Sequence, residues 1–246
     1  MIALIPARAG SKRVPGKNTR LFFGHPLLAY TIAAAQESGV FSEILVCTDD
    51  VSIRAWAAMY GVKAHVAGPP CHTDTCEDIL WVADALNGRR DPSFAILRPT
   101  SPFRSADDIQ RAFLQFEAEG RLIDSLRAVR PVREHPGKMW SLVSGQITPL
   151  LPIEHAWGTP WHSSPTQSLP PYYLQTSSLE MAWSRVVHEH HTISGTRLAG
   201  FLHADPGGFA LDTEADWATA ERWLVVGHAT LPRVRVATQD PATPTQ

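Results

Sequence analysis

The sequence predicts an α/β fold in which a mainly parallel sheet carries helices on both faces. Short apolar segments of strand length alternate with segments of helical apolar spacing through the first 130 residues. The chain has 246 residues, of which 44% are hydrophobic, and this is enough to bury one large core. In a sheet of this kind, ligands bind beyond the carboxyl ends of the strands, so functional residues are expected in the loops that follow them.

Each expected element is supported by its own pattern. Strands are expected at residues 2–6, 43–48, 62–66, 93–97 and 124–130, with a further strand around 197–202. Helices are expected from Pro26, near 51–60, over 75–86, from Ser105 and from about Thr213. Three of these helices begin with a hydroxyl residue that stands three positions before an aspartate, which is the spacing of a capping box: Thr75 with Asp78, Ser105 with Asp108, and Thr213 with Asp216.

Residues 131–178 interrupt this alternation. Proline and tryptophan are frequent there, and the stretch SSPTQSLPPYY at 163–173 fits neither a helix nor a central strand. The segment is therefore predicted to be an irregular insert or arm within a single domain that spans residues 1–228. The tail at 229–246 is rich in proline and threonine and is predicted to be loose.

The composition argues against several classes of partner. The net charge is −2, so no surplus of positive charge points to nucleic acid. No apolar run approaches the roughly 20 residues of a membrane span. The basic residues near the start follow the first apolar segment, unlike those of a signal peptide. The three cysteines lack zinc-binding spacing and are interpreted as free thiols of a cytoplasmic protein.

The stretch LIPARAGSKRVPGKN at residues 4–18 carries the strongest functional signal. It places a glycine and several basic residues directly behind the first strand, where backbone N–H groups can converge on an anion. Gly10 permits close approach of a phosphate to the backbone. Arg8, Lys12 and Lys17 supply positive charges that can neutralise a triphosphate. The stretch is therefore predicted to be a phosphate-binding loop.

Two other phosphate-binding loops fit this stretch less well. A Walker loop, G-x-x-x-x-G-K-S/T, is one residue shorter, because five residues separate Gly10 from Gly16 and Asn18 follows Lys17. A dinucleotide-binding fingerprint is also missing, since the stretch contains no G-x-G-x-x-G. A basic surface loop without a ligand stays open as the alternative.

Several segments together resemble the acylneuraminate cytidylyltransferases, a family of CMP-sialic acid synthetases and their relatives for legionaminic and pseudaminic acids. The opening PARAGSKRVPGKN at 6–18 matches the family signature P-A-R-x-G-S-K-x-x-x-x-K-N at every fixed position. Further similar segments follow in chain order: CTDD at 47–50, RPTSPFR at 98–104, PPYYLQTSSLEMAW at 170–183 and GFALDTEADW at 208–217.

This resemblance implies a Rossmann-like, doubly wound fold of the nucleotidyltransferase type and a homodimer in which the arm reaches the partner. It implies an enzyme that transfers CMP from CTP to the anomeric hydroxyl of a nonulosonic, sialic-acid-like sugar acid, with release of pyrophosphate and with help from Mg²⁺. The residues that match the family's nucleotide site are Ala7, Arg8, Gly10, Ser11, Lys12, Lys17, Asn18 and Ser101, with Arg8, Lys12 and Lys17 as the implied catalytic cations. The residues that match its sugar-acid site are Arg98, Arg104 and Gln167, and Asp212 matches a metal ligand.

The chain departs from the family pattern at four places, one of which is SPTQ at 164–167, where the Arg pair that many members carry before Gln167 is missing. Arg98 stands where a glutamine is usual, and its guanidinium could grip a carboxylate through two parallel hydrogen bonds. The segment GPP at 68–70 replaces an Arg-Pro pair beside the implied cytidine pocket. Ala210 replaces the first aspartate of a D-x-D pair, so that Asp212 alone remains, and Asp212 also suits the positive end of the last helix.

Two alternative functions stay open because of these departures. One is a degenerate member that binds nucleotide without turnover. The other is a cytidylyltransferase whose acceptor is a non-sugar acid such as a phosphonate.

Overall fold

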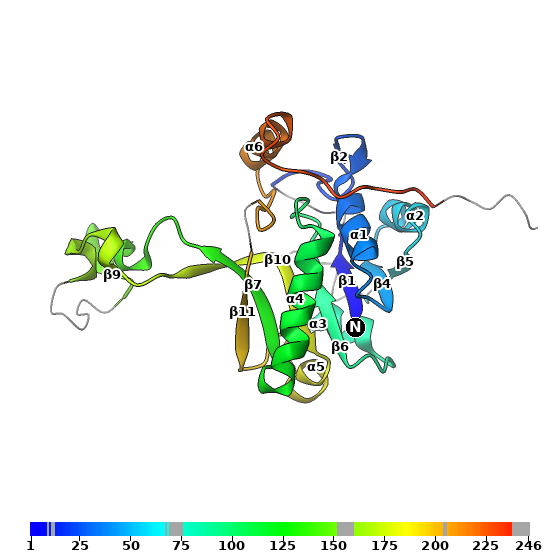
Figure 1. Ribbon diagram of the computed structural model, residues 1–246, viewed down its shortest axis with the longest axis horizontal. Helices are drawn as coiled ribbons and strands as arrows, with labels where there is room; N and C mark the ends of the chain where they lie inside the picture. The colour runs from blue at the N-terminus through cyan, green and yellow to red at the C-terminus, as the bar shows by residue number, and fades with distance from the viewer. Residues whose placement is uncertain are drawn as a thin grey trace, which may run out of the picture. The chain divides into compact units, whose positions relative to one another are not determined.

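A computed structural model describes the chain at residues 1–8, 10, 13–66, 68, 76–151, 160–203 and 206–237 (Figure 1). The main sheet contains β1 (Ile2–Pro6), β4 (Glu43–Cys47), β5 (Lys63–His65), β6 (Ser93–Ile96), β7 (Ser125–Pro131), β10 (Tyr173–Trp183) and β11 (Leu198–Leu202). The helices are α1 (Leu27–Ser38), α2 (Val51–Met59), α3 (Asp78–Leu86), α4 (Ala106–Glu119), α5 (Arg185–His190) and α6 (Glu214–Val225). A short hairpin of β2 (Leu21–Phe22) and β3 (His25–Pro26) precedes α1.

The strands of the main sheet lie in the order β11-β7-β10-β6-β1-β4-β5. β1 is parallel to both β4 and β6, and β5 is parallel to β4. β10 is antiparallel to β6, since it follows the irregular segment rather than the crossover helix that parallel pairing requires. The mainly parallel sheet predicted from the strand and helix alternation is confirmed.

Alternate residues of β1 pack on opposite faces of the sheet, as the geometry of a strand requires. Ala3 and Ile5 belong to a cluster with apolar residues of α1, α2 and α4. Ile2 and Leu4 belong to a second cluster with residues of α3 and α5. All four side chains are fully buried. Helices therefore cover both faces (Figure 1), which confirms the doubly wound, Rossmann-like fold.

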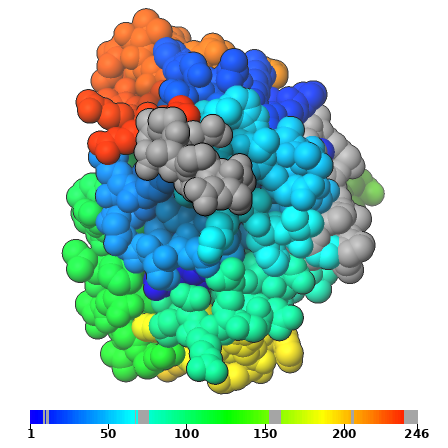
Figure 2. Space-filling model, turned by 90° about the vertical axis from the view of Figure 1, so that its right-hand side faces the viewer, coloured from blue at the N-terminus to red at the C-terminus, as the bar shows by residue number. Residues whose placement is uncertain are grey.

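A third apolar cluster joins segments that are far apart in the sequence. It contains Val14 of the opening loop, Phe103 after β6, and Leu211 and Trp217 near the start of α6. The Arg20 guanidinium lies over the Trp217 ring, 4.2 Å from its centroid. Figure 2 shows the orange helix α6 next to the blue N-terminal segment on this face of the molecule. This cluster fixes α6 against the opening loop.

The start of α3 differs from the sequence prediction. The helix begins at Asp78, and Thr75 lies outside the described residues. The Asp78 carboxylate accepts hydrogen bonds from other side chains, including that of Arg98, so a tertiary contact occupies the group that the capping box would use. The capping boxes predicted at Ser105 and Thr213 are both formed.

The chain divides into two compact units, Met1–Ala128 with Thr176–Gln246, and Val129–Gln175. The second unit contains an antiparallel hairpin of β8 (Trp140–Val143) and β9 (Gln146–Pro149) and a group of aromatic rings: His135, Trp161 and Tyr172. Within the part of the chain that the structure describes, no helix combines the length and the apolar character needed to cross a membrane.

Candidate active site

The opening loop leaves the sheet directly after β1. The Ala7 N–H donates to the Cys47 carbonyl at 2.9 Å, which extends the pairing of β1 with β4 by one residue. The loop returns through Gly16, whose φ of +64° lies in the left-handed region that glycine adopts without strain. Asn18 is buried, and its amide donates to the Arg8 carbonyl at 3.0 Å. Asn18 therefore ties the two ends of the loop together.

The predicted nucleotide residues of this loop differ in exposure. Ala7 is buried, whereas Arg8 and Gly10 are exposed. A Cβ atom at Gly10 would meet no atom within 4 Å, so the described part of the fold leaves open space beside that backbone. Ser11 and Lys12 lie outside the described residues.

Lys17 and Asp212 form an ion pair between the opening loop and the segment before α6. The Lys17 Nζ lies 2.9 Å from Asp212 Oδ1, and the two side chains are 12% and 40% exposed. Arg13 Nη2 lies 3.7 Å from the same oxygen. Two cations thus converge on one carboxylate, and Asp212 holds the Lys17 ammonium in place.

Asp212 is also the carboxylate that the sequence assigns to a metal. Among the described residues, no group of three or more His, Cys, Asp or Glu side chains is placed to hold a metal ion. Ala210 supplies no ligand, and Asp212 is already paired with Lys17. These residues fit a cation that takes most of its ligands from substrate phosphates and water, as Mg²⁺ commonly does.

A buried arginine fixes the segment that follows β6. Arg104 is 1% exposed, and its Nη1 donates to the carbonyl oxygens of Arg98 and Ser178. Burial lowers the pKa of the Arg104 guanidinium to about 9. Arg104, which the family resemblance places near the acceptor, therefore holds the main chain at Arg98.

A backbone hydrogen bond connects the same segment to the Lys17–Asp212 pair. The Leu211 N–H donates to the Thr100 carbonyl at 2.8 Å, and Asp212 is the next residue. Ser101 is 1% exposed, and its hydroxyl has no hydrogen-bond partner among the described residues. The loops that follow β1 and β6 therefore meet the segment before α6 at one edge of the sheet.

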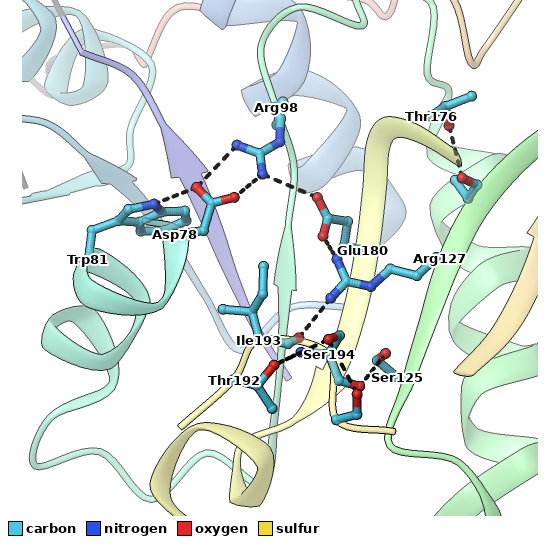
Figure 3. Close-up of polar contacts among 12 residues, drawn as sticks. Asp78, Trp81, Arg98, Ser125, Arg127, Thr176, Glu180, Thr192, Ile193 and Ser194 are labelled. Atoms are coloured by element: carbon cyan, nitrogen blue, oxygen red, sulfur yellow. Dashed lines mark hydrogen bonds and ion pairs between the residues drawn. The ribbon is translucent and has the colours of Figure 1, made fainter. Parts of the chain in front are cut away.

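A row of alternating charges extends inward from Arg98 (Figure 3). Arg98 donates to both oxygens of Asp78, from Nη1 to Oδ1 at 3.5 Å and from Nη2 to Oδ2 at 2.5 Å. Nη2 also donates to Glu180 at 3.3 Å, and Glu180 forms an ion pair with Arg127. Arg127 donates to the Ile193 carbonyl at 2.9 Å. The two parallel hydrogen bonds that Arg98 could offer to an acceptor are made here to Asp78.

The four charged groups differ in exposure. The side chains of Arg127 and Glu180 are 7% and 5% exposed, while those of Arg98 and Asp78 are 24% and 31% exposed. Burial raises the pKa of Asp78, but the hydrogen bond and charge of Arg98 outweigh burial and hold this pKa below its ordinary value. Burial, together with the charge of Arg98, lowers the pKa of Arg127 to about 10. The row therefore pairs two arginines with two carboxylates, whose formal charges sum to zero.

Asp78, Glu180 and Arg127 are the residues of this site that the sequence reasoning missed. Asp78 is predicted from the sequence only as a capping residue of a helix. Arg127 and Glu180 each stand between apolar residues of a strand. A charged residue in such a run is the signal that could have predicted a buried ion pair.

Two predicted positions remain, Gln167 and the segment at 68–70. Gln167 belongs to the second unit, where it is exposed in a single-turn 3₁₀ helix, Thr166–Ser168. Its role toward a sugar acid stays a prediction. In the segment at 68–70, Gly68 is partly exposed, and the two prolines lie outside the described residues.

The fold is similar to that of a solved structure. The solved structure of CMP:2-keto-3-deoxy-manno-octonic acid synthetase complexed with CTP is similar with a TM-score of 0.67 and 15% sequence identity. The match covers 92% of this chain and 98% of that one. At this level of identity, the likeness shows the fold alone.

Sequence relatives show the family. Residues 2–135 match the family model described as Cytidylyltransferase. The chain is 31% identical over 238 residues to the CMP-N,N'-diacetyllegionaminic acid synthase of Legionella pneumophila, with 94% of this chain and 99% of the relative covered. It is 41% identical over 113 residues to an N-acylneuraminate cytidylyltransferase of Escherichia coli, with 46% of this chain and 27% of that protein covered. The chain belongs to the cytidylyltransferase family.

Proposed function

We propose that the chain transfers CMP from CTP to the anomeric hydroxyl of a nonulosonic sugar acid and releases pyrophosphate. The observation that carries this proposal is the match, over 94% of the chain, to a relative named CMP-N,N'-diacetyllegionaminic acid synthase. The Lys17–Asp212 pair supports it, because it holds a cation beside the phosphate-binding loop that the sequence predicts. A cytoplasmic location and a homodimer stay predictions from the sequence.

In the proposed reaction, the acceptor oxygen attacks the α-phosphorus of CTP and loses its proton to water. The bond from that phosphorus to the bridging oxygen breaks, and pyrophosphate leaves. Charge spreads over the phosphate oxygens, so catalysis depends on cations that are fixed before the reaction begins. Lys17 meets this requirement, since its side chain is 12% exposed and its ammonium is held at 2.9 Å by Asp212. We assign Arg8 and Lys12 the same role from the sequence.

The remaining residues are proposed to bind and orient the two substrates. The backbone at Ala7, Gly10 and Ser11 supplies N–H donors to the triphosphate, and Asn18 keeps the loop in shape. From the sequence we assign Ser101 to the nucleotide and Arg98 to the acceptor, and we assign the buried Arg104 to positioning Arg98 through its main chain. Gln167 keeps its predicted role toward the sugar acid on the family resemblance alone. Mg²⁺ held by Asp212 and the substrate phosphates would stabilise the charge on the leaving pyrophosphate.

The test is identification of the product. The protein is incubated with CTP and MgCl₂ and, one at a time, with N-acetylneuraminic, N,N'-diacetyllegionaminic, pseudaminic and 3-deoxy-octulosonic acids. We expect one acid to give a product whose mass is that of the acid plus CMP less one water. A phosphonate is tested in the same way, and product from the phosphonate alone would show that the acceptor is a non-sugar acid. CTP binding without any product would favour a nucleotide-binding protein without turnover, the alternative that Ala210 suggests.

A further inference from the structure

We propose that Asp78 determines acceptor specificity by neutralising Arg98. The Arg98–Asp78 pair then binds an uncharged hydroxyl or acylamino group of the acceptor acid, and the carboxylate of that acid is bound elsewhere. This inference rests on the proposed function, because it assigns a chemistry to one part of the acceptor site. It reverses the interpretation from sequence, in which a free Arg98 attracts an anion.

Arg98 stands at a position that can reach a ligand. The Leu97 N–H donates to the Leu4 carbonyl at 3.0 Å, so the pairing of β6 with β1 continues to Leu97, and Arg98 is the first residue beyond it. In a parallel sheet, this edge is where ligands bind. The Arg98 carbonyl accepts from the buried Arg104, which fixes the main chain that carries the guanidinium.

Carboxylates of the chain itself already compensate the Arg98 charge. Asp78 accepts from both Nη atoms of Arg98, and Glu180 accepts from Nη2 (Figure 3). Glu180 is in turn compensated by Arg127, and both of these side chains are nearly buried. A substrate carboxylate at this point would be a third negative group beside Asp78 and Glu180. Like charges that are this close and partly desolvated repel strongly.

Arg98 and Asp78 retain atoms that can form further hydrogen bonds with a ligand. Arg98 and Asp78 are 24% and 31% exposed, so both side chains meet the solvent. The hydrogen bonds of Arg98 described above use Nη1 and Nη2, which leaves Nε as a donor. Asp78 Oδ1 accepts from Trp81 Nε1 at 2.8 Å, and Oδ2 retains a second lone pair. A hydroxyl or acylamino group satisfies both a donor and an acceptor, whereas a carboxylate satisfies only the donor.

The test is calorimetry on the full chain with excess CTP to fill the nucleotide site and with EDTA to prevent turnover. The two probes are inorganic phosphate and the sugar acid that gives product. We expect Asp78→Asn to bind phosphate about tenfold more tightly than the wild type, because it leaves Arg98 uncompensated on one side. The double variant Asp78→Asn/Arg98→Gln should lose this gain. Arg98→Gln should weaken sugar-acid binding only modestly, by about threefold to tenfold, because an amide also offers one donor and one acceptor.

Asp107→Asn is the matched control. Asp107 also lies in the first turn of a helix and pairs with an arginine, Arg111 at 2.8 Å, but it is 74% exposed. The Asp107→Asn variant should bind both phosphate and the sugar acid with wild-type affinity. Equal phosphate affinity of Asp78→Asn and wild type would overturn the inference. So would a loss of sugar-acid binding of about a hundredfold in Arg98→Gln, which would identify Arg98 as the carboxylate anchor.

The sugar-acid titration of Arg98→Gln tests the inference even if Asp78→Asn does not fold. A failure of the proposed function would appear separately, as absence of sugar-acid binding to the wild type. The phosphate titration of Asp78→Asn would still decide whether Asp78 neutralises Arg98.

Discussion

The Lys17 ammonium lies 2.9 Å from the Asp212 carboxylate, although 195 positions separate the two residues in the chain. Arg13 approaches the same carboxylate at 3.7 Å. The pair joins the opening loop to the segment before α6, and it fixes the cation that we assign to catalysis. Because Asp212 is 40% exposed, the pair contributes only about 0–1 kcal/mol to folding. Its removal should therefore affect the reaction more than the fold.

Asp212→Asn tests the ion pair. We expect kcat to fall by about ten- to a hundredfold, since the Lys17 ammonium loses its anchor, while the free energy of unfolding stays within about 1 kcal/mol of wild type. Steady-state kinetics and urea unfolding measure the two quantities. Glu214→Gln is the control, because it removes a nearby ion pair with Arg20 and should leave kcat unchanged. Similar losses of kcat in both variants would contradict the role of Asp212.

Ala210→Asp tests the metal role of the same segment. The new carboxylate restores the first aspartate of a D-x-D pair, so the dissociation constant for Mg²⁺ should fall by about tenfold in the presence of CTP. Calorimetric titration of MgCl₂ measures this directly and does not depend on turnover. Ala210→Asn supplies a neutral side chain of the same size for comparison. Equal Mg²⁺ affinity in the two variants would count against a metal at Asp212.

Asp124 should make the stability of the first unit depend on acid pH. Its side chain is 5% exposed and accepts from Arg197 at 2.9 Å, from Arg185 at 2.5 Å and from the Thr196 N–H at 3.0 Å. The hydrogen bond from Arg197 leads these effects, and together they hold the pKa of Asp124 well below its ordinary value. The unfolded chain therefore binds a proton at higher pH than the native chain. The free energy of unfolding should be highest above about pH 4 and should fall as the pH drops below it.

Asp124→Asn isolates that contribution. The variant leaves the hydrogen bonds from the partly exposed Arg185 and Arg197 side chains poorly matched, so we expect the free energy of unfolding at pH 7 to fall by about 1–3 kcal/mol. The difference from wild type should shrink as the pH is lowered. Asp107→Asn removes a mainly exposed carboxylate and should cost less than about 0.5 kcal/mol. Urea unfolding at several pH values checks both, and a pH-independent difference would refute the assignment to Asp124.

Gly195 and Gly88 form a matched pair for a steric prediction. Both have positive φ, +68° and +71°, but a Cβ at Gly195 would lie 2.4 Å from Asp124 Cβ, whereas one at Gly88 would meet nothing within 4 Å. Gly88→Ala should cost about 1–2 kcal/mol from backbone strain alone. Gly195→Ala should lower the free energy of unfolding by about 1–3 kcal/mol more, because the loop at Gly195 must move away from Asp124, the residue before β7. Equal losses in thermal unfolding would show that the close contact carries no energy.

The starts of α4 and α6 could be predicted from the sequence because capping is a local interaction. Ser105 with Asp108 and Thr213 with Asp216 lie three positions apart, and both capping boxes are formed. The start of α3 could not be predicted in this way. Asp78 is occupied by Arg98, which lies 20 positions further along the chain, and no local pattern reports such a contact.

The sequence proposes candidate residues for the site but not the contacts between them. The resemblance at residues 6–18 and 208–217 indicates that Lys17 and Asp212 are functional, but their pairing depends on the packing of Val14 and Leu211 in one apolar cluster. The pairing of Arg98 with Asp78 of α3 and Glu180 of β10 depends on these two elements meeting beside β6. It becomes visible only when these elements are placed in space.

The most direct test of the proposed function is pyrophosphate release from CTP by the wild type and by Lys17→Ala, each with and without the panel of sugar acids. We predict release that requires one acid and that falls by about a hundredfold or more in Lys17→Ala, with thermal unfolding unchanged. Release that needs no acid, or that persists in Lys17→Ala, would contradict the assignment of a cytidylyltransferase site to this loop.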